Sequence, residues 1–138
     1  MSDQVQAVTS AALPAPLGPY SPATVTGNLV FVSGQAGKDP RTGQLAGPDV
    51  EAQTEQALRN IAAILQAAGS GLSHVLRCGV FLVDIREFPR MNEVYARTFQ
   101  GHRPARTTVE VSRLPGDGLR VEIDAIAVIP RESLVPDR

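Results

Sequence analysis

The sequence predicts an α+β domain in which two helices pack on one face of a β-sheet. Strand-like and helix-like apolar patterns follow one another in the order strand, strand, strand, helix, strand, helix, strand, strand. Two helices can cover only one face of a sheet. The runs 29–33 and 80–83 are nevertheless apolar on both faces, so the second face must also be dry. Self-association is its simplest cover, and we expect a homo-oligomer.

Size and composition narrow the class of protein. A chain of 138 residues with 43% hydrophobic content is one domain, 1–138. A net charge of −1 and 4% aromatic residues argue against nucleic-acid binding. There is one cysteine, and no basic leader or long apolar run, so we expect a cytoplasmic protein without a membrane span. His74, Cys78 and His102 lack ligand spacing, so no metal is expected.

The N-terminal third is predicted to be a small β-structure. Residues 5–8 favour a short opening strand, and four prolines within 11–22 indicate an extended, irregular segment. Residues 23–33 are typical of a β-hairpin around Gly27-Asn28. The glycine-rich segment 34–39 lacks the spacing of a phosphate-binding loop, and we interpret it as a turn.

Two amphipathic helices follow. The first is expected to start near Pro48 or Asp49, to bury residues at three- and four-residue spacing and to stop at Gly69. After a strand at 75–83, Asp84 and Glu87 resemble a capping box for a second helix. The apolar face of that helix is expected to comprise Phe88, Met91, Val94, Tyr95 and Phe99.

Residues 104–125 are predicted to form a second hairpin that organises the rest of the chain. Side chains alternate between the two faces of a strand, so every second residue from Ala105, and every second residue from Leu119, is expected to face the core. Leu114 to Gly118 has turn chemistry, with Asp117-Gly118 able to supply a positive φ. The other face carries Arg106, Thr108 and Glu122. On its own this is a solvated strand face, but beside another subunit it becomes a candidate site.

Several short motifs together resemble the RidA (YjgF) family of reactive-intermediate deaminases. Their order and spacing are more specific than any single motif. The resemblance runs from about Gly18 to Val128, so the core of the domain is expected to span about 18–128 and the tail 130–138 to be loose. The motifs are Gly18-Pro-Tyr-Ser-Pro22, Val32-Ser-Gly-Gln35, Met91-Asn-Glu-Val-Tyr95, Pro104-Ala-Arg106, Val109-Glu-Val111, Arg113-Leu-Pro115 and Val121-Glu-Ile-Asp-Ala125.

The resemblance implies a fold and an activity. The fold would be like that of trimeric chorismate mutase, with the sheets of a homotrimer forming an inner barrel and clefts between subunits. The activity would be cofactor-free hydrolysis of enamines and imines, such as 2-aminoacrylate and 2-aminocrotonate, to 2-keto acids and ammonia. The expected partner is a small-molecule carboxylate.

The resemblance also implies roles for individual residues. Arg106 would bind the substrate carboxylate through its planar fork, and Glu122 would orient water or exchange a proton. Tyr20 and Ser33 would line the cleft, and Asn92 would lie near it. The backbone around Thr108 would bind substrate. From their own patterns alone, Tyr20, Ser33 and Asn92 are ordinary structural or solvated residues, and Glu110 and Asp124 are interface salt-bridge candidates.

Two departures from the family pattern concern activity and substrate preference. Thr108 stands where the archetypal enzymes have a cysteine. The segment 100–104 is shorter than theirs and lacks an aromatic residue before Pro104. His102 lies on this segment and could reach the cleft rim or be simply solvated.

Two other functions stay open: a non-catalytic protein of the same fold that binds 2-keto acids, and an interaction protein.

Overall fold

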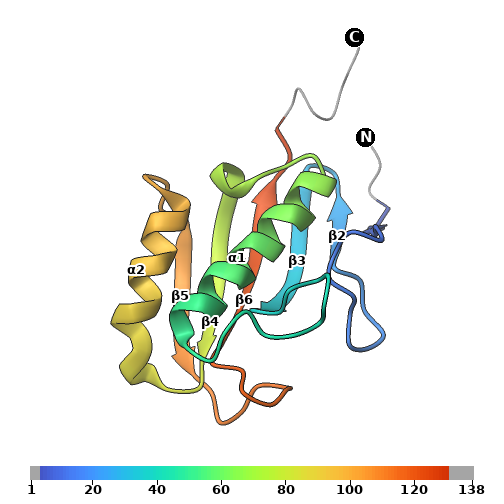
Figure 1. Ribbon diagram of the computed structural model, residues 1–138. Helices are drawn as coiled ribbons and strands as arrows, with labels where there is room; N and C mark the ends of the chain where they lie inside the picture. Colours follow the sequence, from blue (N-terminus) through green and yellow to red (C-terminus); the bar gives the residue numbers. More distant parts are fainter. Residues whose placement is uncertain (1–3, 131–138) are drawn as a thin grey trace.

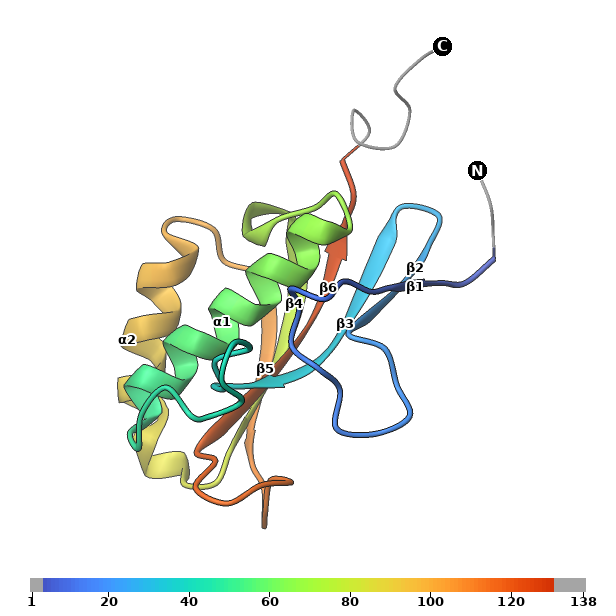
Figure 2. The same ribbon diagram turned by 45° about the vertical axis from the view of Figure 1, so that its right-hand side comes forward.

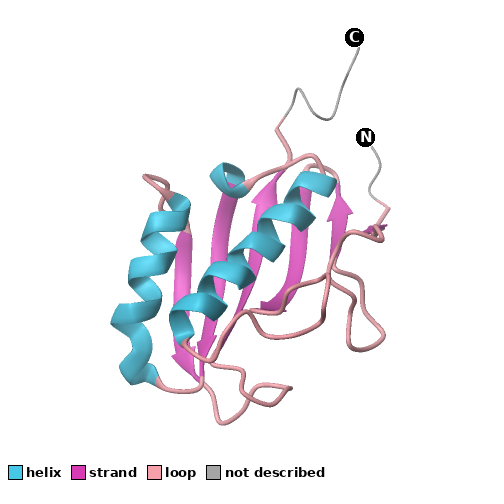
Figure 3. Ribbon diagram, in the orientation of Figure 1, coloured by secondary structure: helices cyan, strands magenta, loops and turns pink. Residues whose placement is uncertain are grey.

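The computed structural model describes residues 4–130, which form one six-stranded mixed sheet and two α-helices (Figure 1, Figure 3). The predicted order of elements and the α+β class are confirmed. The expected loose tail falls mostly on residues 131–138, outside the described residues. The elements are β1 (Gln6–Val8), β2 (Ala23–Thr26), β3 (Leu29–Ala36), α1 (Val50–Ala67), β4 (Val75–Leu82), α2 (Phe88–Phe99), β5 (Ala105–Glu110) and β6 (Val121–Val128).

The first predicted hairpin is confirmed. β2 pairs antiparallel with β3 from Ala23 opposite Val32 to Thr26 opposite Leu29. Gly27 closes the turn with a φ of 57°, a left-handed value that glycine adopts without steric cost. β1 then pairs antiparallel with the free edge of β2. Figure 2 shows this end of the sheet extending beyond the part that the helices cover.

Helix α1 lies across the sheet as its periodicity predicts. Asp49 caps it, because the Asp49 carboxylate accepts a hydrogen bond of 2.8 Å from the Ala52 N–H. Its apolar face is fully buried against β3 and β6. The helix ends at Ala67, two residues before Gly69, whose φ is 87°. Both helices lie on the same side of the sheet (Figure 2).

The capping box expected at the start of α2 does not form. Asp84 caps a separate 3-10 turn, Ile85–Glu87, by accepting a hydrogen bond from the Arg86 N–H, so no capping box with Glu87 forms. The α-helix itself begins at Phe88, with Pro89 in its first turn. Proline favours that position because its fixed φ suits a helix and its missing N–H would have had no partner there.

The second predicted hairpin is wrong. The sheet order is β1-β2-β3-β6-β4-β5, so β6 lies between β3 and β4, and β5 forms the far edge. β5 pairs in parallel with β4 because the chain between them crosses the sheet as α2. The ten residues 111–120 then carry the chain past β4 to its other side. The turn at Gly118 (φ 76°) exists, but it belongs to this crossing and not to a hairpin.

The same correction changes which face of β5 is covered. The predicted core residues of β6, including Val121 and Ile123, are buried beneath the helices. On β5 the predicted core set is instead exposed, and Val109 is 38% exposed. Arg106 and Thr108 lie on the helix side of the edge strand. Alternation identifies the residues that share a face, but only the sheet order shows which face the helices cover.

The face of the sheet opposite the helices has no cover in one chain, as predicted from the doubly apolar strands. Phe31 on β3 is 41% exposed there, and it pairs with the half-buried Ile126 of β6. Phe81 and Val109 extend the apolar surface across β4 and β5. Neither helix within residues 4–130 combines the length and apolar character needed to cross a bilayer.

Candidate active site

Arg106 lies on the edge strand β5 beneath helix α2, where several side chains hold its guanidinium. One terminal nitrogen, Nη2, donates a hydrogen bond of 2.6 Å to Asn92 Oδ1. The guanidinium carbon lies 4.6 Å from the ring centroid of Tyr95 and 5.5 Å from that of Phe88. Such cation–π contacts and a charged hydrogen bond reduce the freedom of a long side chain. Arg106 is therefore oriented before any ligand arrives.

The Arg106 guanidinium has no acidic partner among residues 4–130. Five other arginines in this part of the chain form ion pairs, whereas the hydrogen bonds of Arg106 go to an amide oxygen and, at 4.0 Å, to the Met91 sulfur. Arg106 borders a cavity of about 380 Å³ together with Asn92, Tyr95, Gln100, His102 and Arg103. Its lining contains cationic and neutral side chains only, so the cavity suits an anion.

His102, expected either to reach the cleft rim or to be solvated, is anchored. Its Nε2 lies 2.7 Å from the Val75 carbonyl oxygen and donates to it, since a carbonyl only accepts. The ring also meets Phe99 edge-on, with centroids 6.1 Å apart. Nearby, Gln100 ends α2 with a φ of 58°, an uncommon value for a residue other than glycine. These contacts shape one wall of the Arg106 cavity.

Glu122 lies on β6 and faces the side of the sheet without helices. Burial raises the pKa of its carboxyl, and the negative charge of Asp124 two residues along the same strand face raises it further. The raised pKa favours the protonated acid. Such a group can donate a proton and, once ionised, take one back.

The position of the Glu122 carboxylate depends on Gly34 of β3. An ideal Cβ built at Gly34 would clash with Oε2 of Glu122. The clash arises in a bulged region, where the register between β3 and β6 shifts between Val32 and Gln35. Glycine at this point therefore leaves room for the carboxylate.

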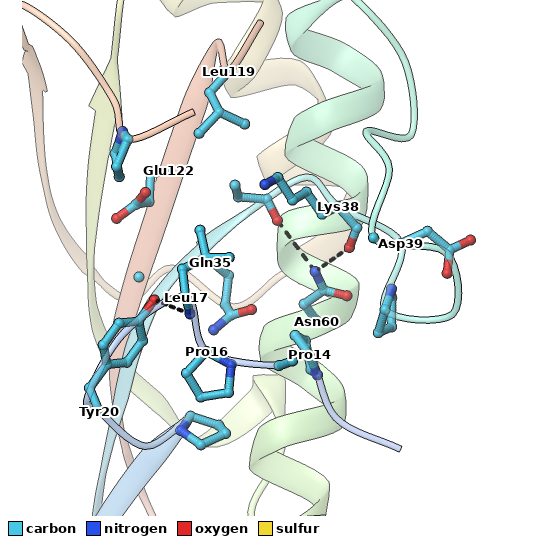
Figure 4. Close-up of a pocket in the computed structure, with 17 residues that line it drawn as sticks. Pro14, Pro16, Leu17, Tyr20, Gln35, Lys38, Asp39, Asn60, Leu119 and Glu122 are labelled. Atoms are coloured by element: carbon cyan, nitrogen blue, oxygen red, sulfur yellow. Dashed lines mark hydrogen bonds between the residues drawn. The ribbon is translucent and has the colours of Figure 1, made fainter. Parts of the chain in front are cut away.

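A second cavity, of about 250 Å³, lies beside Glu122 (Figure 4). Its wall comprises the proline-rich segment 14–22 on one side and Leu119 on the other. Tyr20 borders it, and the Tyr20 hydroxyl accepts a hydrogen bond of 3.2 Å from the Leu17 N–H. Lys38 and Asn60 line the side toward α1.

Ser33 and Thr108 take up different positions from Glu122 and Arg106. The Ser33 hydroxyl donates a hydrogen bond of 2.7 Å to the Ser21 carbonyl oxygen, which ties the proline-rich segment to β3. With Tyr20 it borders a shallow hollow next to Phe31. Thr108 shares the strand face of Arg106 but lines neither the Arg106 cavity nor the Glu122 cavity.

Arg106 and Glu122 face opposite sides of one sheet. Arg106 is in register with Cys78, which is buried on the helix side, whereas Glu122 is in register with Phe81 on the open side. The expectation that Glu122 lies on the matching face of a neighbouring strand is therefore wrong. The chain presents two partial sites, one with Arg106 and Asn92, and one with Glu122 and Tyr20.

No group of three His, Cys, Asp or Glu side chains that could hold a metal occurs within residues 4–130.

Comparison with known proteins decides the family. The family model described as Endoribonuclease L-PSP matches residues 10–129. The chain belongs to this family. A RutC family protein of Pyrococcus horikoshii is 52% identical over 114 residues, or 83% of this chain and 90% of the relative. The 2-iminobutanoate/2-iminopropanoate deaminase of Bos taurus is 45% identical over 129 residues, or 93% of each chain.

A solved structure supports the fold. E. coli TdcF with bound serine matches with a TM-score of 0.83 and 36% identity, over 89% of this chain and 98% of that one. The predicted resemblance to RidA (YjgF) proteins, which belong to the same family, is confirmed.

Sequence reasoning nevertheless missed how Phe88 and Tyr95 contact Arg106. Their spacing with Asn92 on one helix face was visible, but their contact with β5 depends on the parallel pairing of β4 and β5.

Proposed function

We propose that the protein hydrolyses reactive imines, and the enamines that tautomerise to them, to 2-keto acids and ammonia. The substrates would be small 2-imino carboxylates such as those formed from 2-aminoacrylate and 2-aminocrotonate. The observation that carries the proposal is the oriented guanidinium of Arg106, which has no acidic partner in residues 4–130 and borders an open cavity. A carboxylate would complete its hydrogen bonding.

The proposed chemistry needs one acid–base group besides the arginine. Water adds to the imine carbon, the imine nitrogen gains a proton, and the carbinolamine then loses ammonia to leave the keto group. Glu122, whose pKa is raised, would donate the proton to nitrogen and take one from water. Holding substrate and water together would supply the rest of the acceleration. No step in this scheme requires a cofactor.

We further propose that the working site forms between subunits. Arg106 and Glu122 face opposite sides of the sheet, so a common site would need Arg106 from one chain and Glu122 from the next. The uncovered apolar face around Phe31 and Phe81 supports association through that side. A closed ring of three subunits, as the family resemblance implies, would repeat the same contact three times. Tyr20, Ser33 and Asn92 would then line the shared cleft, and the backbone near Thr108 would contact substrate.

Names of relatives support the catalytic proposal. Mammalian relatives at 43–45% identity, from Bos taurus, Capra hircus and Rattus norvegicus, carry the name 2-iminobutanoate/2-iminopropanoate deaminase. The second candidate is a protein that binds small carboxylates without turnover. TdcF with bound serine favours it, because a bound amino acid requires only recognition groups.

The test is the rate of 2-keto acid and ammonia release from 2-aminoacrylate that a dehydratase generates in place. We expect wild type to exceed the uncatalysed rate, and Arg106→Ala and Glu122→Gln to lose that excess. If wild type adds nothing to the uncatalysed rate yet binds 2-oxobutanoate, the deaminase proposal fails for this substrate and the binding protein replaces it. Sedimentation measures the number of subunits on the same samples.

A further inference from the structure

Lys38 is the only lysine in the chain, and it lines the cavity beside Glu122 (Figure 4). Its backbone is fixed on several sides. Asn60, which is buried in α1, donates a side-chain hydrogen bond of 2.8 Å to the Lys38 carbonyl oxygen. The Lys38 N–H donates to the Ala36 carbonyl oxygen at 2.9 Å, and an isolated bridge joins Lys38 to Leu45. The side chain therefore starts from a rigid point in the cavity wall.

The Lys38 ammonium has no ion-pair partner in the part of the chain that the structure describes. The two carboxylates that share its cavity are those of Asp39 and Glu122. Arg41 engages Asp39, with a side-chain ion pair of 3.0 Å and a backbone N–H hydrogen bond of 2.9 Å. Glu122 forms no ion pair with Lys38 within 4.0 Å, and Figure 4 shows the two residues on different sides of the cavity. Lys38, a half-buried residue, is thus left without a counter-charge.

The other walls of this cavity are mostly apolar. Pro14, Pro16 and Leu17 form one side and Leu119 forms another, and Pro115 also lines the cavity. Between mostly apolar walls, attraction between opposite charges is weakened less than in open water, so an anionic ligand group in this cavity would be drawn to the unpaired lysine. The cavity has room for more than the reacting imine carbon and its water, since its volume is about 250 Å³. Its charge and shape suit an anionic side chain on a small substrate.

We propose that Lys38 binds a second anionic group of the substrate, so that the preferred imines are those of dicarboxylic amino acids. This inference rests on the proposed imine hydrolysis. Arg106 would hold the carboxylate next to the imine carbon, and Lys38 would hold the side-chain carboxylate. The reaction itself is unchanged: water adds across the C=N bond, the C–N bond of the carbinolamine breaks, and a 2-oxo dicarboxylate and ammonia leave. Lys38 makes and breaks no covalent bond, so it is a specificity-determining residue.

The turnover test compares two imines, one formed from glutamate and one from alanine by an amino-acid oxidase in the presence of catalase. The measured quantity is the ratio of kcat/KM for the glutamate imine to that for the alanine imine. We expect this ratio to be about tenfold or more lower in Lys38→Met than in wild type, because one charge pair in a partly shielded site is lost. Lys38→Arg keeps the positive charge, so its ratio should stay close to that of wild type. Arg59→Met removes an exposed charge on α1 and leaves both rate constants unchanged.

The outcomes separate this inference from the proposed function. An unchanged ratio in Lys38→Met, or a wild type that accelerates only the alanine imine, overturns the dicarboxylate preference and leaves imine hydrolysis standing. If wild type accelerates neither imine, hydrolysis fails, and calorimetry then decides the Lys38 site. In that case weaker binding of 2-oxoglutarate relative to 2-oxobutanoate in Lys38→Met supports the anionic subsite, and an equal effect on both ligands overturns it.

Discussion

The carboxylate of Glu122 occupies the space in which a residue other than glycine at position 34 would place its Cβ. Gly34 lies on β3 and Glu122 on the neighbouring β6, and the bulge in β3 brings the glycine backbone against the carboxylate. One small residue on one strand thereby sets where the proposed acid–base group of the next strand can stand.

Replacing Gly34 with alanine is therefore expected to displace Glu122. The new Cβ meets a side chain with several rotatable bonds, so the carboxylate can move, and the cost in unfolding free energy should stay within about 1–3 kcal/mol. The rate of imine hydrolysis should fall more than tenfold, because the acid–base group leaves its position. Gly71→Ala is the control, since nothing lies within 4 Å of a Cβ there. Retention of full activity in Gly34→Ala would argue that the Glu122 position does not matter.

Mixing two inactive variants tests the site between subunits. Arg106→Ala and Glu122→Gln each lose one partial site, so each homo-oligomer should be inactive. When the two proteins are unfolded together and refolded at equal amounts, about a quarter of the interfaces should combine an intact Arg106 with an intact Glu122. We expect activity to return to about a quarter of the wild-type value. If the mixture is as inactive as its components, either both residues act in a site within one subunit or neither residue belongs to the site.

The raised pKa of Glu122 predicts a pH effect on stability. In the folded protein this carboxyl keeps its proton to higher pH than in the unfolded chain, so between the two pKa values the native state binds more protons. Its stabilising contribution is present below the ordinary glutamate pKa of 4.5 and is lost as pH rises through the folded value. Thermal melts of wild type and Glu122→Gln from pH 4 to 8 measure this. Wild type should lose stability relative to the glutamine variant as pH rises.

Asn92 is expected to position Arg106. Asn92→Ala removes a charge-assisted hydrogen bond of 2.6 Å. A loss of about 1.5–3 kcal/mol of ligand binding corresponds to a rise in KM of roughly 10- to 150-fold, with a smaller change in kcat. The same variant should weaken 2-oxobutanoate binding by a similar factor, which calorimetry measures. Asn92→Asp tests the electrostatics, because a carboxylate there would compete with the substrate for the guanidinium.

Tyr95 offers a matched pair of variants for the same guanidinium. Its buried hydroxyl lies next to the Cys78 thiol, which is only a weak hydrogen-bonding group, so Tyr95→Phe should cost little stability and keep the ring beneath Arg106. Tyr95→Leu keeps an apolar side chain but removes the aromatic face. We expect KM to rise in the leucine variant and not in the phenylalanine variant, by a factor consistent with about 0.5–2 kcal/mol for a cation–π contact. Equal KM values in the two variants would exclude the ring as a positioning group.

Local patterns determined the order and kind of the elements. The 3.6-residue period of α1, its cap at Asp49 and the Gly27-Asn28 turn are short-range signals, and the structure confirms them. The two doubly apolar strands also indicated an uncovered face, which the exposed Phe31 bears out. These features depend on neighbours within a few residues along the chain, and such interactions leave a direct pattern in the sequence.

Only the tertiary structure decided where β5 lies. Polar and apolar residues alternate in the same way along a strand in a hairpin and along a strand at a distant edge. The sequence therefore could not show that α2 carries β5 into parallel pairing with β4. That choice places Arg106 under α2, against Tyr95, and turns it away from Glu122. The separation of the two residues follows from long-range strand pairing, which is set by packing of the whole sheet and not by the local order of polar and apolar residues.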